Sequence, residues 1–89
     1  MRPTTREALG MVALERARQE RLKADGKFPA TCADAWMTPS EKLAVLVEEV
    51  GEVARHLCDA HQPNNLNTQG LRDELTQVAA VAVAWLESL

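Results

Sequence analysis

Aromatic residues and cysteine are scarce in this chain of 89 residues. There is no Tyr, one Phe and two Trp, so aromatics make up only 3% of the sequence. That is too few for the core of a β-sandwich, or for a platform on which the bases of a nucleic acid polymer stack. Two cysteines, Cys32 and Cys58, do not make a disulfide framework, and we expect both to be free thiols in a reducing compartment.

Long hydrophobic runs are missing from the sequence as well. The longest, from Val78 to Leu86, is about half the length that a bilayer span needs. Residues 1–4, Met-Arg-Pro-Thr, do not open an apolar signal segment. We therefore expect a soluble, cytoplasmic protein that neither spans nor binds a membrane.

Ala, Leu, Val, Glu and Arg are abundant, and these residues favour helices. A length of 89 residues fits a single domain over residues 1–89. The net charge of -3 is unevenly divided: residues 1–27 hold seven Lys/Arg and four acids (+3), and residues 28–89 hold three and nine (-6). This division fits a site with carboxylates for a cation and guanidinium groups for an anion, or two halves that attract each other.

Capping signals predict where helices begin and end. Thr4-Thr5-Arg6-Glu7 has the pattern of a capping box and opens a first helix. This helix ends at Asp25-Gly26, where glycine suits the left-handed conformation that follows a helix. Thr38-Pro39-Ser40-Glu41 opens a second helix, with Thr as the N-cap and Pro in the first turn.

The remaining boundaries follow from composition and period. Residues 27–37 have neither a helical nor a strand period and are predicted to be a loop. The second helix is expected to reach Asp59 or Ala60, and a second loop covers 61–68. The third helix is expected to begin near Gly70 or Leu71.

The apolar residues of the second and third helices predict how they pack. Val45 lies among polar residues on one side of the second helix, which indicates that this side also contacts something. From Val78 onward the third helix is apolar on all sides, and three short helices cannot surround it. We expect an all-α, antiparallel bundle of three helices that is completed by homo-oligomerisation, as a dimer or a tetramer. The stripe of the second helix that we expect to face the core consists of Leu43, Leu46, Val47, Val50, Val53, Ala54 and Leu57.

Oxygen-bearing side chains occur in one-turn pairs on two helices, Glu49 with Glu52 and Glu74 with Gln77. Carboxylates so close together repel one another unless they face solvent or a cation, so an enclosed face would indicate a divalent metal. Oxygen ligands without Cys or His favour Mg²⁺ or Mn²⁺ over Zn²⁺. The alternative is a solvated acidic surface that is balanced by basic neighbours.

Two segments carry a resemblance to a known family. Leu-Ala-Val-Leu-Val-Glu-Glu-Val-Gly-Glu-Val-Ala at 43–54, followed by Leu-Arg-Asp-Glu-Leu-Thr-Gln-Val at 71–78, resembles the MazG-like all-α nucleoside triphosphate pyrophosphatases. Their signature is Glu-Glu-x-x-Glu on one helix and Glu-x-x-Asp on the next. The resemblance covers residues 38–89, and residues 1–37 look like those of small bacterial and phage-borne members. It implies Mg²⁺-dependent hydrolysis of an NTP, a dNTP or a related nucleotide to the monophosphate and pyrophosphate.

The resemblance also implies roles for the acidic residues. Glu49, Glu52 and Glu74 would be metal ligands, and Glu48 would act with Glu49 in catalysis by supporting the ligands or activating water. Gln77 stands where the signature has Asp; its amide oxygen can ligate Mg²⁺ but carries no charge, which lowers the affinity for the metal. Two alternatives stay open: a protein that binds a nucleotide without cleaving it, and a structural helical module with a basic protein partner.

Five other residues are candidates for binding the nucleotide substrate. Arg16, Arg18 and Gln19 could close over its phosphates, or they could belong to a solvated helix face. Trp36 could stack on the base or could anchor a core or an interface. Lys42 could contact a phosphate or could pair with an acidic neighbour.

Two further features have ordinary explanations. Asn64 and Asn65 could contact a base edge or could form a turn. His56, Cys58 and His61 are close in sequence, but a structural zinc site needs four ligands and no fourth is near, so we do not expect zinc.

Overall fold

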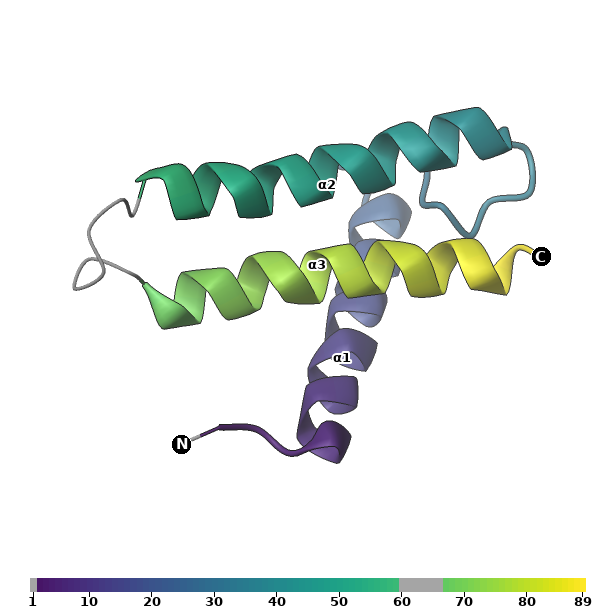
Figure 1. Ribbon diagram of the computed structural model, residues 1–89. Coiled ribbons are helices and arrows are strands. Elements are labelled where there is room, and N and C mark those ends of the chain that lie inside the picture. The colour runs from purple at the N-terminus through teal and green to yellow at the C-terminus, as the bar shows by residue number, and fades with distance from the viewer. Residues whose placement is uncertain (1, 60–66) are drawn as a thin grey trace.

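Three α-helices make up the computed structural model, which describes residues 2–59 and 67–89 (Figure 1). α1 spans Thr5–Ala24, α2 spans Pro39–Asp59 and α3 spans Thr68–Glu87. α2 and α3 lie side by side and run antiparallel, and α1 crosses behind them and packs against α3 (Figure 1). The described residues contain no strand, so the all-α prediction is confirmed. None of the three helices combines the length and the apolar character needed to cross a lipid bilayer.

The predicted capping signals begin α1 and α2. The Glu7 amide donates to the Thr4 hydroxyl at 3.1 Å, and the Thr4 amide donates to the Glu7 carboxylate at 3.0 Å. Thr38 and Glu41 make the same reciprocal pair at the start of α2, at 3.1 and 3.0 Å. After α1 the chain reverses through Gly26, whose φ of 77° is strained for any residue with a β-carbon. Both helix starts and the end of α1 therefore lie where the sequence predicts them.

α3 begins earlier than predicted, at Thr68 instead of Gly70 or Leu71. The reason is Asn67, whose side-chain oxygen accepts from the Gly70 amide at 3.0 Å and so caps the helix. Gly70 also permits a close approach, because a β-carbon there would lie 2.6 Å from Cε1 of His56 on α2. The His56 Nε2 lies 3.0 Å from the Asn67 carbonyl oxygen. These contacts join the end of α2 to the start of α3.

Small side chains form the core where the helices meet residues 25–38, the first connection, which joins α1 to α2. Cys32, Ala80, Val81 and Ala84 are buried. Partly buried apolar side chains pack against this cluster: Ala33, Met37, Val45, Leu46 and Trp85. Trp85 thus packs on the core, and Val45 makes the apolar contact that its position among polar residues predicts.

The predicted orientation of α2 is only partly correct for the single chain. Leu46 of the predicted stripe packs on the core, but four other members of the stripe are turned outward: Leu43 is 51% exposed, Val47 59%, Val50 50% and Leu57 48%. The inner side carries Val45 and the buried Lys42 instead. Packing within one chain is decided by these inner contacts, and the more apolar side of α2 is left uncovered.

Candidate functional site

A cavity of about 430 Å³ lies where α1, α2, α3 and the first connection meet. Most of its wall is apolar, and two carboxylates, an amide and a hydroxyl supply polar groups. Its size and character fit a pocket for a small organic molecule with a few directing polar contacts. The lining residues are Gln19, Phe28, Pro29, Ala30, Thr31, Cys32, Met37, Val45, Glu48, Glu49 and Val81.

The connection that walls the cavity is held to α1 by polar contacts. Asp34 accepts from the Thr31 amide at 2.8 Å and forms an ion pair with Lys23 of α1. The Thr31 hydroxyl donates to Glu20 of α1 at 2.8 Å. The hydrogen bond from Lys23 and that from the Thr31 amide hold the pKa of Asp34 below its usual value. Residues 31–34 therefore form a fixed turn and not a loose loop.

Glu49 lies on the α2 wall of this cavity and is half-buried. Its Oε2 atom is buried and has no hydrogen-bond partner among residues 2–59 and 67–89. Burial raises the pKa of the Glu49 carboxyl above its usual value, and the charges of Glu74, Glu48, Glu52 and Glu15 raise it further. An unsatisfied carboxylate oxygen among like charges is unfavourable unless a proton or a cation accompanies it.

The other carboxylates surround Glu49 without forming a closed cage. Glu48 lines the same cavity and is exposed, Glu52 is exposed, and Glu74 on α3 is half-buried. In the part of the chain that the structure describes, no three His, Cys, Asp or Glu side chains are arranged to hold a metal ion. A cation beside Glu49 would therefore take one or two carboxylates and complete its coordination with water or substrate oxygens, as Mg²⁺ commonly does.

Gln77 belongs to different surroundings. It lines a second cavity of about 580 Å³ between α1 and α3, which shares no lining residue with the cavity of Glu49. Arg18 lines this second cavity and pairs with Glu15 at 3.0 Å. The structure thus places both residues away from the cavity wall that carries Glu48 and Glu49.

Arg16 is buried and donates hydrogen bonds to three side chains of the protein. Its Nε donates to Glu87 at 2.7 Å, and its terminal nitrogens donate to Glu20 and Gln19, each at 2.9 Å. These contacts tie α1 to the end of α3 and leave the guanidinium facing protein acceptors. Gln19 is also buried, but it lines the cavity of Glu49 and keeps its place among the substrate-binding candidates.

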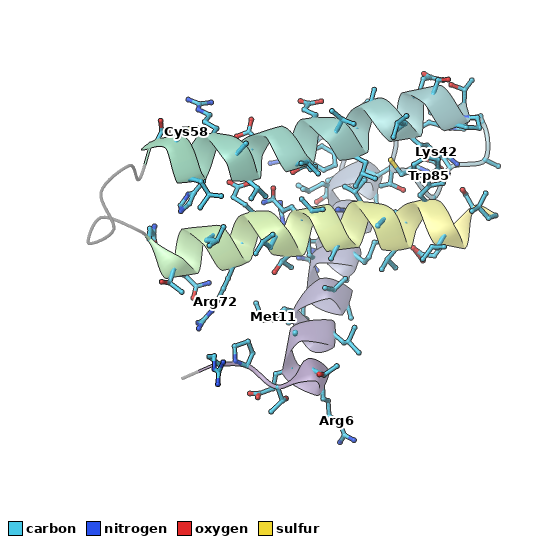
Figure 2. All side chains as sticks on the ribbon, in the orientation of Figure 1. Arg6, Met11, Lys42, Cys58, Arg72 and Trp85 are labelled. Atoms are coloured by element: carbon cyan, nitrogen blue, oxygen red, sulfur yellow. The ribbon has the colours of Figure 1, made fainter. Side chains whose placement is uncertain are left out.

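The surroundings of Lys42 and Trp36 also differ from those that the sequence predicts. Lys42 is only 4% exposed and donates to the Ser88 hydroxyl at 2.7 Å, next to Trp85 at the end of α3 (Figure 2). The Ser88 hydroxyl in turn donates to the Trp85 carbonyl at 2.7 Å. Trp36 is 65% exposed and lines neither cavity, so it is neither a core anchor nor a cavity wall in the single chain.

Sequence reasoning missed the first connection as a cavity wall. Phe28, Thr31, Cys32 and Met37 line the cavity but lie in a segment without any period. Cys32 and Cys58 are free, as expected, and burial raises the pKa of the Cys32 thiol, so it stays protonated at neutral pH. His61, Asn64 and Asn65 lie outside the described residues.

The fold and the site together define an all-α protein with a carboxylate-bearing cavity at the junction of its three helices. Comparison with protein-family models, with curated proteins and with solved structures finds no match to this chain.

Proposed function

We propose that this chain is a Mg²⁺-dependent nucleotide pyrophosphohydrolase, which cleaves an NTP, a dNTP or a related nucleotide to the monophosphate and pyrophosphate. The observation that carries the proposal is the buried, unpartnered Glu49 Oε2 on the wall of a cavity sized for a small molecule. The same proposal places the protein in the cytoplasm, with free nucleotides as its substrates.

The carboxylates supply what a cation needs. Glu49 would hold it, and Glu74 and Glu52 are the neighbours whose charges already act on Glu49. Bound there, Mg²⁺ would neutralise phosphate oxygens and orient the attacking water. The orphaned oxygen fits such an ion, because coordination would give it the partner that the protein itself does not provide.

Side chains of the cavity would accept the proton, cover the base and orient it. Glu48, which is exposed on the cavity wall, would accept the proton of the water that attacks the α-phosphorus, and pyrophosphate would leave as the bond from that phosphorus to the bridging oxygen breaks. The apolar wall of Phe28, Met37 and Val45 would cover the base and exclude water. Gln19 would direct the base through its amide, while Arg16 positions Gln19 by a hydrogen bond.

A phosphorus NMR time course on a panel of NTPs and dNTPs tests the proposal. We expect Mg²⁺-dependent release of pyrophosphate that EDTA abolishes and that Glu49→Gln lowers at least a hundredfold. Glu41→Gln is the matched control, because it makes the same change on α2 at a residue that only caps the helix. Absence of turnover on every nucleotide at high enzyme concentration contradicts the proposal.

A second candidate function is nucleotide binding without cleavage. Two observations favour it: Gln77 has no charge, and it lines the other cavity. Calorimetry separates the two functions, since tight nucleotide binding with no product supports the binder.

A further inference from the structure

Gln19 on α1 presents a free hydrogen-bond donor to the cavity of Glu49. Its side chain lines that cavity, and the residue is only 8% exposed. Its Oε1 atom accepts a hydrogen bond from Nη1 of Arg16 at 2.9 Å. Its Nε2 atom has no partner among residues 2–59 and 67–89 and is not sealed off, because only Oε2 of Glu49 is both fully buried and unpartnered in the buried and half-buried part of that range. The N–H groups of Nε2 are therefore available to a ligand.

Arg16 determines which end of the Gln19 amide faces the cavity. A guanidinium group has only donors, so the amide must turn its oxygen toward Arg16. Arg16 is itself held in place, since it also donates to Glu87 at 2.7 Å and to Glu20 at 2.9 Å. Turning the amide over would set N–H groups against N–H groups beside a buried cation, which is unfavourable. Gln19 therefore directs its donors into the cavity, and its acceptor away from it.

The other polar side chains of the cavity wall differ from Gln19 in their chemistry. The Thr31 hydroxyl donates its proton to a carboxylate of α1 at 2.8 Å. Glu48 and Glu49 are carboxylates, which accept hydrogen bonds or bind a cation. Apart from the weak thiol donor of Cys32, the remaining side chains that line the cavity are apolar. Among the described side chains of the wall, Gln19 is thus the one strong donor that is free.

The burial of Gln19 indicates which edge of a base it would meet. A cation at Glu49 would hold the phosphates, so the base would enter the cavity with the edge that lies farthest from the sugar. That edge carries position 4 of a pyrimidine or position 6 of a purine. Uracil, thymine, hypoxanthine and guanine have an oxo group at this position, whereas cytosine and adenine have an amino group.

We infer that Gln19 selects the base of the nucleotide, and that the preferred substrates are those whose base has the oxo group. This inference rests on the proposed function, which makes the ligand a nucleotide. The oxo oxygen accepts from Gln19 Nε2, and the Arg16 guanidinium behind the amide strengthens the bond. An amino group at the same place sets donor against donor, and both groups are left without a partner in a largely apolar wall.

Turnover of dUTP and dCTP by the wild-type chain in Mg²⁺ tests the inference. The two nucleotides have the same sugar and phosphates and differ only along the base edge that carries position 4. We expect kcat/KM to be at least about tenfold higher for dUTP, mainly through a lower KM, because the contact is made before and during the reaction. Turnover with equal kcat/KM, or with a preference for dCTP, overturns the inference and leaves the pyrophosphohydrolase standing.

Gln19→Glu tests whether Gln19 causes the preference. One carboxylate oxygen can stay with Arg16, and the other then offers the cavity an acceptor in place of a donor. We expect the preference to reverse in favour of dCTP. Gln69→Glu is the matched control, because Gln69 is exposed, lines only the second cavity and leaves the wild-type preference unchanged. A Gln19 that merely fills space would alter turnover of both nucleotides alike, and that result overturns the inference.

Binding of the monophosphates dUMP and dCMP covers the case in which nothing is cleaved or Gln19→Glu does not fold. We expect the wild type to bind dUMP at least about tenfold more tightly, and the Gln19 side-chain amide resonance to shift with dUMP but not with dCMP. This preference without turnover of any nucleotide supports the inference and contradicts only the pyrophosphohydrolase. Equal shifts with both monophosphates overturn the inference, since they would place Gln19 at the shared phosphate. Without turnover, failure of both to bind overturns the inference together with the proposed function.

Discussion

Arg16 and Glu87 are 71 positions apart in the sequence and are joined by a hydrogen bond of 2.7 Å between Nε and a carboxylate oxygen. This bond lies where α1 crosses the end of α3. Glu20 and Gln19 bind the same guanidinium, so a single buried arginine fixes the crossing and the position of a cavity residue.

Glu87→Gln is therefore expected to lower the free energy of unfolding by about 1 kcal/mol, because a charged hydrogen bond to a buried arginine becomes a neutral one while the half-exposed Glu87 limits the loss. Urea denaturation followed by circular dichroism measures this. Asp59→Asn, in the largely exposed pair with Arg55, is the control and changes little. Equal effects in the two variants would contradict the role of Arg16.

Glu49→Gln is expected to raise the melting temperature of the metal-free protein. The wild-type carboxylate is destabilised by burial and by its acidic neighbours, and the amide removes the charge. Thermal unfolding in EDTA measures the change. A lower melting temperature, or loss of helical signal, would show that the Glu49 charge supports the fold.

Magnesium is expected to raise the melting temperature of the wild type by mass action and to leave that of Glu49→Gln unchanged. Comparing calcium-free buffers with and without magnesium, at matched ionic strength, separates binding of the ion from screening of charges on the protein. An equal rise in both proteins would show that the ion acts elsewhere.

Asp34 is expected to make stability depend on pH in the acid range. Its pKa is lowered in the fold from an ordinary 3.8, so the unfolded chain takes up a proton first as pH falls. Stability from Asp34 is therefore present above pH 3.8 and is lost as the pH falls through the folded-state pKa. The difference in stability between wild type and Asp34→Asn, followed by urea titration at each pH, should shrink in that window. A difference that is constant with pH would contradict the ion pair with Lys23.

Two glycine substitutions are expected to have opposite effects. Gly26→Ala costs about 1 kcal/mol because φ is 77° there. Gly10→Ala stabilises α1 by about 0.5–1 kcal/mol, since it is helical and a β-carbon would meet nothing within 4 Å. Chemical denaturation of both variants checks the signs.

The sequence predicts local structure well because capping is local. Thr4 with Glu7, Thr38 with Glu41 and Gly26 each act within a few residues, so their patterns identify helix ends. The start of α3 is missed because Asn67 is one of several turn-forming residues in its segment, and only the bond to Gly70 selects it.

Packing is harder to predict because it depends on partners far away in the sequence. Leu43 and Val47 lie on the more apolar side of α2. However, Lys42 donates a hydrogen bond to Ser88, and Val45 packs on the core beside Val81. These two contacts turn the side of α2 that carries Lys42 and Val45 inward. The one-turn spacing of Glu49 with Glu52 and of Glu74 with Gln77 predicts an acidic pair on each helix, and the charge of Glu74 acts on Glu49 in the fold. The spacing carries no information on the cavity wall, which comes from an aperiodic segment.

That wall has a consequence for how new selectivity can arise. The carboxylates of the cavity lie on helices, whereas Phe28, Pro29 and Met37 belong to the first connection, a short tether that is held by the hydrogen bond between Thr31 and Asp34. Exchanging residues of the tether would reshape the chamber while leaving the acidic groups in place. Selection can thus retune which molecule fits without rebuilding the chemistry.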